Sequence, residues 1–465
     1  MSGDRLRNKT STHHIGLAAL LSYLVLASFA IGYDFLYFGD GAYIAFTFAT
    51  GHPWELFWHY FPLRLGSSIL VGAPVWLFAQ LGASPVLIGK AYQVIFLSMP
   101  LLSSVLLRQL VPSKEYELWV TWLIFLFATL GMSTFGYPTE TWIMLALLLP
   151  VFAMIIYPQS GFRAQFKYLL IPLFCFSYEA VALCAPAILV ALYKQFDSGD
   201  RKNRLRILTI AIAFAACGAI WSLLYFDFVP NNPLLVRALR ENQKHLWTLR
   251  FLKIPISFYS TIVVSIVLYH ALWSTKRPEI IESKWFRIIL AILPLLVLLQ
   301  ILIVPTPNHR YFSRTPIVWL APLIAFAFAQ RPTCLSKNVI YYIVLPAIIV
   351  QTVYAGYSIH GWSVYRSAMQ SYTQNRTILA CSKWRSYVWK FLPRSSHYYW
   401  GWATPYTMIM LNGRHNLNDI ILDDVGWYVP TTCDNARKYY PKAKFVSTKS
   451  IELLIQDICT KNTTD

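Results

Sequence analysis

The chain has 465 residues, of which 56% are hydrophobic and only 13% are charged. Apolar runs extend over most of its length, which excludes a string of soluble domains and favours a polytopic membrane protein. The formal net charge of +19 lies in short segments between these runs and in the tail. Charge so placed orients a membrane protein and contacts membrane lipids, so we expect no nucleic-acid partner.

About 11 apolar segments are candidate membrane spans. Because lipid offers the backbone no hydrogen-bond partners, we expect each to be helical. The stretch 168–192 is too long for one comfortable span and short for two, so we predict a compact hairpin or re-entrant pair with Glu179 near its apex. The candidate segments are 15–32, 86–107, 118–134, 141–157, 168–178, 179–192, 207–226, 254–274, 288–304, 315–330 and 339–356.

Basic residues indicate the orientation. With a cytoplasmic N-terminus, the inside segments hold 18 Lys and Arg residues, and the outside segments hold 9, the tail excepted. This places a large first loop, 34–85, on the external face. The apolar segment 67–83 could cross instead and reverse every later loop, so the span count stays open there. The charge distribution favours a loop that dips into the membrane, in a multi-pass protein of a bacterial inner membrane.

The pattern changes after Tyr357, where shorter and more polar segments begin. We therefore divide the chain into a transmembrane domain, 1–356, and a small external α/β domain, 357–465. The tail contains Cys381, Cys433 and Cys459. If the tail faces an oxidising compartment, three cysteines allow one disulfide, whose pairing the sequence leaves open.

Asp40 stands in "YFGDGAYIAFTFATGHPWE", directly after the first span. One interpretation is structural, with Asp40 capping the N-terminus of an interfacial helix. Another follows from the motif: residues 40–44, DGAYI, followed by 50–53, TGHP, resemble the D-D-A-Y-I…G-x-G pattern of GT-C glycosyltransferases. Gly41 stands where that pattern has its second acid. This departure puts any metal site built on paired carboxylates in doubt.

The resemblance implies an integral membrane glycosyltransferase that uses a sugar on a polyprenyl phosphate. In that superfamily an acid of the first loop acts as general base, which assigns the role to Asp40, with Asp34 as the alternative. An aspartate in a partly dry cleft suits this task. GT-C proteins also often carry an acid, preceded by a histidine, at the outer end of a short helical hairpin. The resemblance therefore implies a role for Glu179, although the residue before it is Tyr178 and not histidine. Tyr43 and His52 of the motif are then candidate contacts to the acceptor sugar.

The external stretch "PTPNHRYFSRTP" carries Arg310 and Arg314 four residues apart, beside His309 and Tyr311. Guanidinium groups suit phosphate oxygens, so this cluster is a candidate site for the donor phosphate. It could also anchor lipid head groups at a span end. Trp400, in "SSHYYWGW", could stack on an acceptor sugar or seat the tail on the membrane surface.

The sequence thus predicts transfer of a sugar from a polyprenyl-phosphate donor to an envelope glycan or lipid acceptor. It indicates no cofactor beyond that donor, and it leaves a divalent metal doubtful. An envelope polysaccharide polymerase or ligase shares the aromatic and arginine-rich loops. A transporter or flippase would carry ionisable groups in the middle of spans, where this chain has few. A scaffold whose tail recruits partners is a further alternative.

Overall fold

The computed structural model describes most of the first half of the chain and much of its tail. The described residues are 2–56, 64–115, 119–120, 123, 140–228, 292, 294–296, 298–299, 342, 344–374, 378–401, 403–412, 419–421, 433–442 and 446–462. Predicted spans 254–274 and 315–330 lie outside them.

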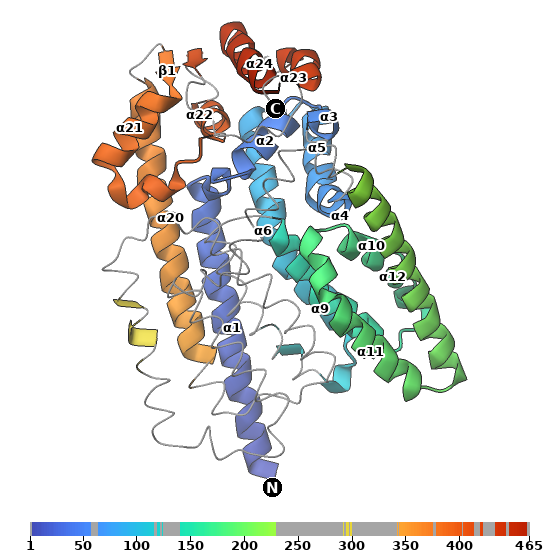
Figure 1. The fold of residues 1–465 in the computed structure, drawn as a ribbon. Coiled ribbons are helices and arrows are strands. Elements are labelled where there is room, and N and C mark those ends of the chain that lie inside the picture. The colour runs from blue at the N-terminus through green and yellow to red at the C-terminus, as the bar shows by residue number, and fades with distance from the viewer. Residues whose placement is uncertain are drawn as a thin grey trace.

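Helices dominate the described chain (Figure 1). The first half contains α1 Ser2–Gly32, η1 Phe35–Tyr37, α2 Gly41–Ala49, α3 Pro53–Leu56, α4 Leu65–Ser67, η2 Ser68–Gly72, α5 Ala73–Gln80, α6 Pro85–Leu110, η3 Ser113–Glu115, α9 Thr141–Ile156, η5 Gly161–Gln165, α10 Phe166–Cys175, η6 Glu179–Cys184, α11 Ala185–Asp197 and α12 Arg201–Phe228. The tail contains α20 Leu345–Gln374, β1 Ile378–Ala380, α21 Cys381–Phe391, η9 Pro393–Tyr398, α22 Thr404–Asn412, β2 Asp419–Ile421, α23 Cys433–Tyr439, η10 Tyr440–Lys442 and α24 Thr448–Asn462.

Three described helices are long and apolar enough to cross a membrane: α1 over His14–Gly32, α6, and α12 over Arg201–Tyr225. A fourth crossing results if α9 and the segment ending with α10, which are bent by 114°, count as one span. The described part is therefore a helical protein of the membrane type. These three helices coincide with the predicted spans 15–32, 86–107 and 207–226.

Local signals in the sequence account for where these helices begin and end. Ser84 caps α6, because its hydroxyl accepts the N–H of Leu87 at 3.3 Å, and Pro85 follows in the first turn. At the other end of the bundle, the Arg206 guanidinium of α12 donates to three carbonyls of residues 154, 155 and 157 at 2.9, 2.9 and 3.1 Å. These bonds satisfy carbonyls that the end of α9 leaves without helical partners.

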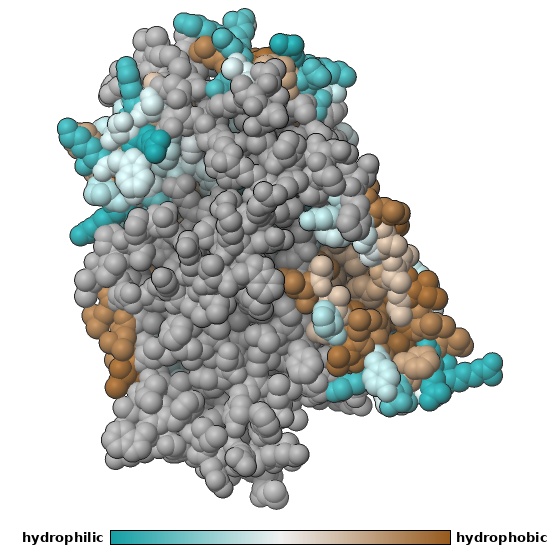
Figure 2. Space-filling model, viewed as in Figure 1, coloured by the Kyte–Doolittle hydropathy of each residue, from teal (hydrophilic) through white to brown (hydrophobic). Residues whose placement is uncertain are grey.

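The core of the first half is α9, whose residues are all buried. Helices α6, α10 and α11 pack against it, and α12 packs against α10 and α11. Large apolar side chains on α1 and α12 instead face outward, among them Leu21, Phe29, Ile212 and Leu223. Figure 2 shows hydrophobic residues along the face formed by α10–α12, with hydrophilic residues beyond its lower end and over the tail at the top. This arrangement is typical of a protein whose apolar middle layer contacts lipid and whose two ends contact water.

The ambiguous segment 67–83 belongs to a loop whose two ends lie close together. The Gln80 side-chain amide donates to the Gly51 carbonyl at 3.5 Å, so residues 51 and 80 lie together at the end of the bundle where α1 finishes. Between them, the Gly66 N–H donates to the Phe176 carbonyl at 2.8 Å. The helical stretch Leu65–Gln80 is shorter than a span. Residues 51 and 80 thus lie together at one end of the bundle, and the dip of this loop into the membrane stays a prediction.

The predicted hairpin 168–192 corresponds to α10, η6 and α11. The chain rises through α10, turns at residues 176–184 and returns through α11, and both helices pack on α9 and α12. Glu179 begins the turn's 3-10 helix, η6.

The tail does not begin at residue 357. Helix α20 continues without a break from Leu345 to Gln374, so the predicted domain boundary falls inside a helix. It packs beside α1 and then against η9 and α22 (Figure 1). The change to polar residues after Tyr357 therefore marks where one helix leaves the apolar layer.

Two three-residue strands, β1 and β2, pair in parallel in the tail, with Ile378 opposite Asp419. A disulfide joins Cys433 to Cys459, which ties α23 to α24, and Cys381 is buried outside it. This pairing is one of those that the sequence allows.

Candidate functional site

Asp40 lies in the turn before α2, at the end of the bundle opposite the N-terminus. Its carbonyl accepts the N–H of Ile44 at 3.0 Å, which places it in the N-cap position. Its side chain makes no capping hydrogen bond, and the residue is partly exposed. The capping interpretation is therefore wrong for the carboxylate, which must be explained in another way.

Gly41 explains why the second acid of the GT-C pattern is missing. A Cβ atom at this position would lie 1.6 Å from the Leu36 carbonyl oxygen and 3.4 Å from the Tyr92 ring. The first of these neighbours is backbone, so no side chain fits without moving η1. The close approach of η1, α2 and α6 thus leaves space for one carboxylate where the pattern has two.

Tyr92 of α6 has two acids in its surroundings, Asp40 and Glu140. Its ring packs beside Gly41, and the charges of Glu140 and Asp40 both act on its hydroxyl. Glu140 immediately precedes α9 and is buried. The sequence analysis missed Glu140, although a single acid heading the apolar run "TWIMLALLLP" is a signal that could have found it.

Arg64 faces Glu140 from the re-entrant segment. Its guanidinium nitrogen lies 3.1 Å from a Glu140 carboxylate oxygen, and both side chains are only 8% exposed. Neither Glu140 oxygen has hydrogen-bond geometry with a donor in the described part of the chain. A buried carboxylate with a charged partner and no hydrogen bond among the described residues is a candidate functional group.

The same arginine connects this pair to the turn that contains Glu179. The Arg64 guanidinium stacks over the Tyr178 ring, 4.8 Å from its centroid, and the Ser67 hydroxyl donates to the Ser177 carbonyl at 2.5 Å. The backbone of Glu179 follows directly, whereas its side chain is outside what the structure describes. Asp40, Glu140 and the Glu179 turn therefore belong to one end of the bundle.

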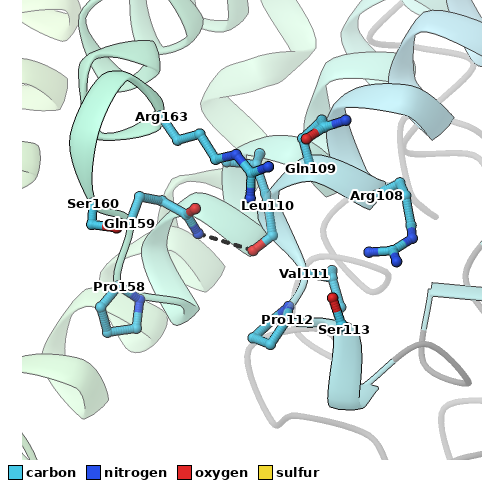
Figure 3. Close-up of a pocket in the computed structure, with 10 residues that line it drawn as sticks. All are labelled: Arg108, Gln109, Leu110, Val111, Pro112, Ser113, Pro158, Gln159, Ser160 and Arg163. Atoms are coloured by element: carbon cyan, nitrogen blue, oxygen red, sulfur yellow. Dashed lines mark hydrogen bonds between the residues drawn. The ribbon is translucent and has the colours of Figure 1, made fainter.

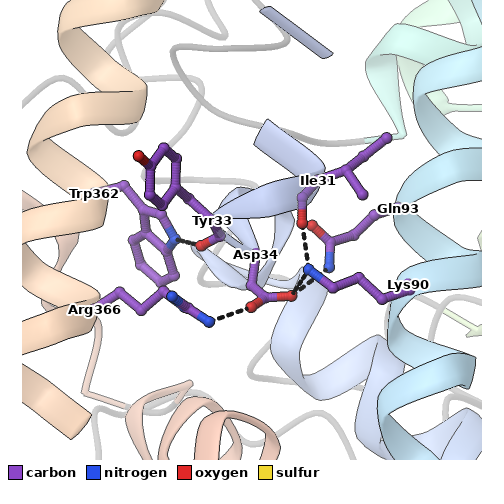
Figure 4. A network of polar contacts seen from close by, with 7 residues as sticks. All are labelled: Ile31, Tyr33, Asp34, Lys90, Gln93, Trp362 and Arg366. Carbon is purple, nitrogen blue, oxygen red and sulfur yellow. Dashed lines mark hydrogen bonds and ion pairs between the residues drawn. The ribbon is translucent and has the colours of Figure 1, made fainter. Parts of the chain in front are cut away.

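Asp34 forms a separate ion cluster (Figure 4). One carboxylate oxygen lies 2.6 Å from the Lys90 ammonium and accepts the Gln93 amide at 3.1 Å. The other accepts the Arg366 guanidinium at 2.8 Å. Lys90 also donates to the Ile31 carbonyl. The cluster joins α1, α6 and α20, and it carries one more positive than negative charge.

The backbone at Asp34 is strained. Its φ of 55° lies in the left-handed region, and Asp34 is the only described residue other than glycine with a positive φ. Burial, and after it the charge of Asp34, raise the pKa of the neighbouring Tyr37 phenol, while Arg366 opposes the rise. Both Asp34 oxygens contact protein groups in this structure, so the residue anchors the helices that it joins. Its role as the alternative base stays a prediction.

Tyr43 and His52 contact protein groups. The Tyr43 side chain is fully buried, its hydroxyl donates to the Leu56 carbonyl at 2.6 Å, and its ring meets Tyr406. His52 lies 3.2 Å from the Lys442 ammonium and packs on the Tyr439 ring. In this structure both residues join the first loop to the tail, and their contacts to an acceptor sugar stay a prediction.

Further contacts hold the tail over this end of the bundle. The hydroxyls of Tyr406 and Tyr440 lie 2.9 Å apart, and burial raises the pKa of both phenols. The Trp362 indole N–H donates to the Tyr33 carbonyl at 2.8 Å. Trp400 packs partly buried against the core at the end of η9.

The predicted phosphate cluster, His309, Arg310, Tyr311 and Arg314, lies outside the described residues. Within those residues, no group of three or more His, Cys, Asp or Glu side chains gathers as metal ligands would. Arg64 and Lys442 lie in or near the first loop, as do Lys90 and Arg366, which the sequence analysis did not select. Lys90 and Arg366 are far from Asp34 in the sequence, so no local motif could reveal that they lie beside it.

No family model, no curated protein and no solved structure matches this chain.

Proposed function

We propose that this chain is a membrane glycosyltransferase of the GT-C type that moves a sugar from a polyprenyl-phosphate donor to an envelope glycan or lipid. The observation that carries the proposal is the position of Asp40: it opens the first loop helix at the end of the bundle opposite the N-terminus, and its side chain does not cap that helix. The resemblance of residues 40–44 to the GT-C motif supplies the reaction class.

In this mechanism the bond between the sugar's anomeric carbon and the phosphate oxygen breaks, and the acceptor hydroxyl forms the new glycosidic bond. Asp40 takes the acceptor proton as positive charge develops on the sugar. Glu140 and Glu179 orient the acceptor or the donor. The polyprenyl phosphate leaves with its negative charge, and Arg310 with Arg314 hold it.

The proposed topology has about 11 spans, a cytoplasmic N-terminus and a periplasmic α/β tail in a bacterial inner membrane. Two observations support this orientation. The basic residues Arg108, Arg163 and Arg201 flank the ends of α6, α9 and α12 on the side of the N-terminus, as the positive-inside rule requires. The tail, on the other side, holds the Cys433–Cys459 disulfide, which suits an oxidising compartment.

The test is a mass profile of envelope glycans and glycolipids from the host with the gene deleted and then restored. We expect deletion to remove one sugar-sized mass from one product and to leave its precursor. Loss of longer chains would instead indicate a polymerase or ligase. An unchanged glycan profile in the deletion would contradict the proposal and favour a transporter or scaffold.

A further inference from the structure

A polar cavity of about 490 Å³ lies at the end of the bundle opposite Asp40 (Figure 3). It sits where α6 and α9 finish, between residues 108–113 and 158–163. Arg108 enters from α6, and Arg163 enters from the 3-10 helix that precedes α10. The lining residues include two arginines and no carboxylate. The chemistry of this cavity therefore favours an anion.

Side chains contact the helix ends around this cavity. The Gln159 amide, which lines the cavity, donates to the Leu110 carbonyl at 2.9 Å, at the end of α6. Arg206 covers the last carbonyls of α9. Both contacts weaken the negative potential of the helix ends near the two arginines. Glu115, two residues beyond the cavity, accepts the hydroxyl of Tyr157 and keeps its negative charge, which the two arginines outnumber.

The surroundings of the cavity indicate which anion it takes. Phe162, next to Arg163, is 80% exposed and packs edge-on against Phe166. Leu169 is also exposed on the following helix. Exposed aromatic and aliphatic side chains beside arginines, at the height where spans end, are typical of the interfacial layer of a bilayer. A free phosphate would contact only the arginines, whereas a phospholipid would contact the arginines with its head group and the exposed apolar side chains with its acyl chains.

We propose that this cavity binds the phosphate head group of an anionic phospholipid. Arg108 and Arg163 hold the phosphate oxygens, the hydroxyls of Ser113 and Ser160 face the head group, and the acyl chains run past Phe162 into the apolar layer. The lipid is a bound structural partner on the side opposite the proposed reaction. The site does not depend on glycosyl transfer.

The experiment uses the full chain purified in mixed micelles of phosphatidylglycerol and phosphatidylcholine. Retained lipid is quantified by mass spectrometry for the wild type, for the double variant Arg108→Gln with Arg163→Gln, and for Arg201→Gln. Arg201 is exposed at the same end and lies outside the cavity, so it is the matched control. Competition with inorganic phosphate is measured in parallel.

An arginine that holds the lipid head group directly contributes about 1 kcal/mol, which is about fivefold in affinity, whereas the charge of an exposed arginine outside the cavity is screened by water and salt. We therefore expect the wild type to enrich phosphatidylglycerol, the double variant to lose about 25-fold in affinity, and Arg201→Gln to stay within about twofold. Equal retention by the double variant, or an equal loss in Arg201→Gln, would overturn the proposal. Tight binding of inorganic phosphate without enrichment of phosphatidylglycerol would overturn its assignment to a lipid.

Discussion

Asp34 and Asp40 are six residues apart, yet the structure treats them differently. Asp34 is 7% exposed, adopts a left-handed backbone and has both carboxylate oxygens occupied by Lys90, Gln93 and Arg366. Asp40 is partly exposed, adopts an ordinary helical backbone and does not cap its helix. One carboxylate joins three helices, and the other is partly exposed at the start of α2. This difference is the reason that we propose Asp40, and not Asp34, as the base.

Substitution of Asp40 should have the largest effect on sugar transfer, and it tests the comparison with Asp34. Asp40→Asn keeps the shape of the side chain and removes the proton acceptor, so we expect sugar transfer to fall by about 10²–10⁴-fold. Thermal unfolding in detergent should change little, because asparagine keeps the size and one carbonyl oxygen of the side chain and α2 loses no capping bond. A comparable loss of stability would assign Asp40 to the fold instead.

Glu140→Gln tests the second acid. The change leaves the Arg64 guanidinium buried without an opposing charge, and breaking a buried pair in this way costs about 3–5 kcal/mol. We expect a matching fall in unfolding free energy. The double variant Arg64→Met with Glu140→Leu removes both charges, so it should recover stability but not transfer. Recovery of transfer in the double variant would exclude a role for Glu140 in the reaction.

Gly41→Asp restores the acid that the GT-C pattern carries at this position. Because the new Cβ atom would overlap the Leu36 carbonyl, we expect a loss of about 3 kcal/mol in stability. Gly82→Asp is a matched control, since its Cβ atom would meet nothing within 4 Å and both sites lie in the first loop; its own positive φ makes it modestly strained. The unfolding midpoints of the two variants measure the difference. Equal midpoints would contradict the close approach at Gly41.

Asp34→Asn should lower stability by about 2 kcal/mol, because Lys90 and Arg366 lose their shared anion but remain partly exposed to solvent. Asparagine tolerates the left-handed backbone, so the variant isolates the charge. We expect reduced transfer in proportion to the folded fraction. A complete loss of transfer in well-folded protein would show that Asp34 takes part in chemistry.

Lys442→Ala should have the smallest effect, within about 0.5 kcal/mol. The Lys442–His52 contact between tail and first loop is exposed, and exposed polar contacts contribute little. A differential unfolding assay of the purified chain measures the change. A loss above about 2 kcal/mol would show that this contact, and not the buried aromatic cluster around Tyr406, holds the tail.

Local patterns predicted much of the helical part and the place of Asp40. The apolar runs 15–32, 86–107 and 207–226 became α1, α6 and α12, since length and hydropathy dictate a span. The pairing of Arg64 with Glu140 and the Asp34 cluster could not be predicted, because their members are 76, 56 and 332 residues apart. The boundary at 357 failed for another reason: hydropathy changes where α20 leaves the apolar layer, while the backbone continues as a helix.

The most direct test of the account compares Asp40→Asn and Asp34→Asn in the deletion host at matched levels of folded membrane protein. The mass of the acceptor glycan is measured in each strain. The account predicts that Asp34→Asn restores the missing sugar and that Asp40→Asn does not. Restoration by Asp40→Asn would contradict the assignment of the general base to the first loop.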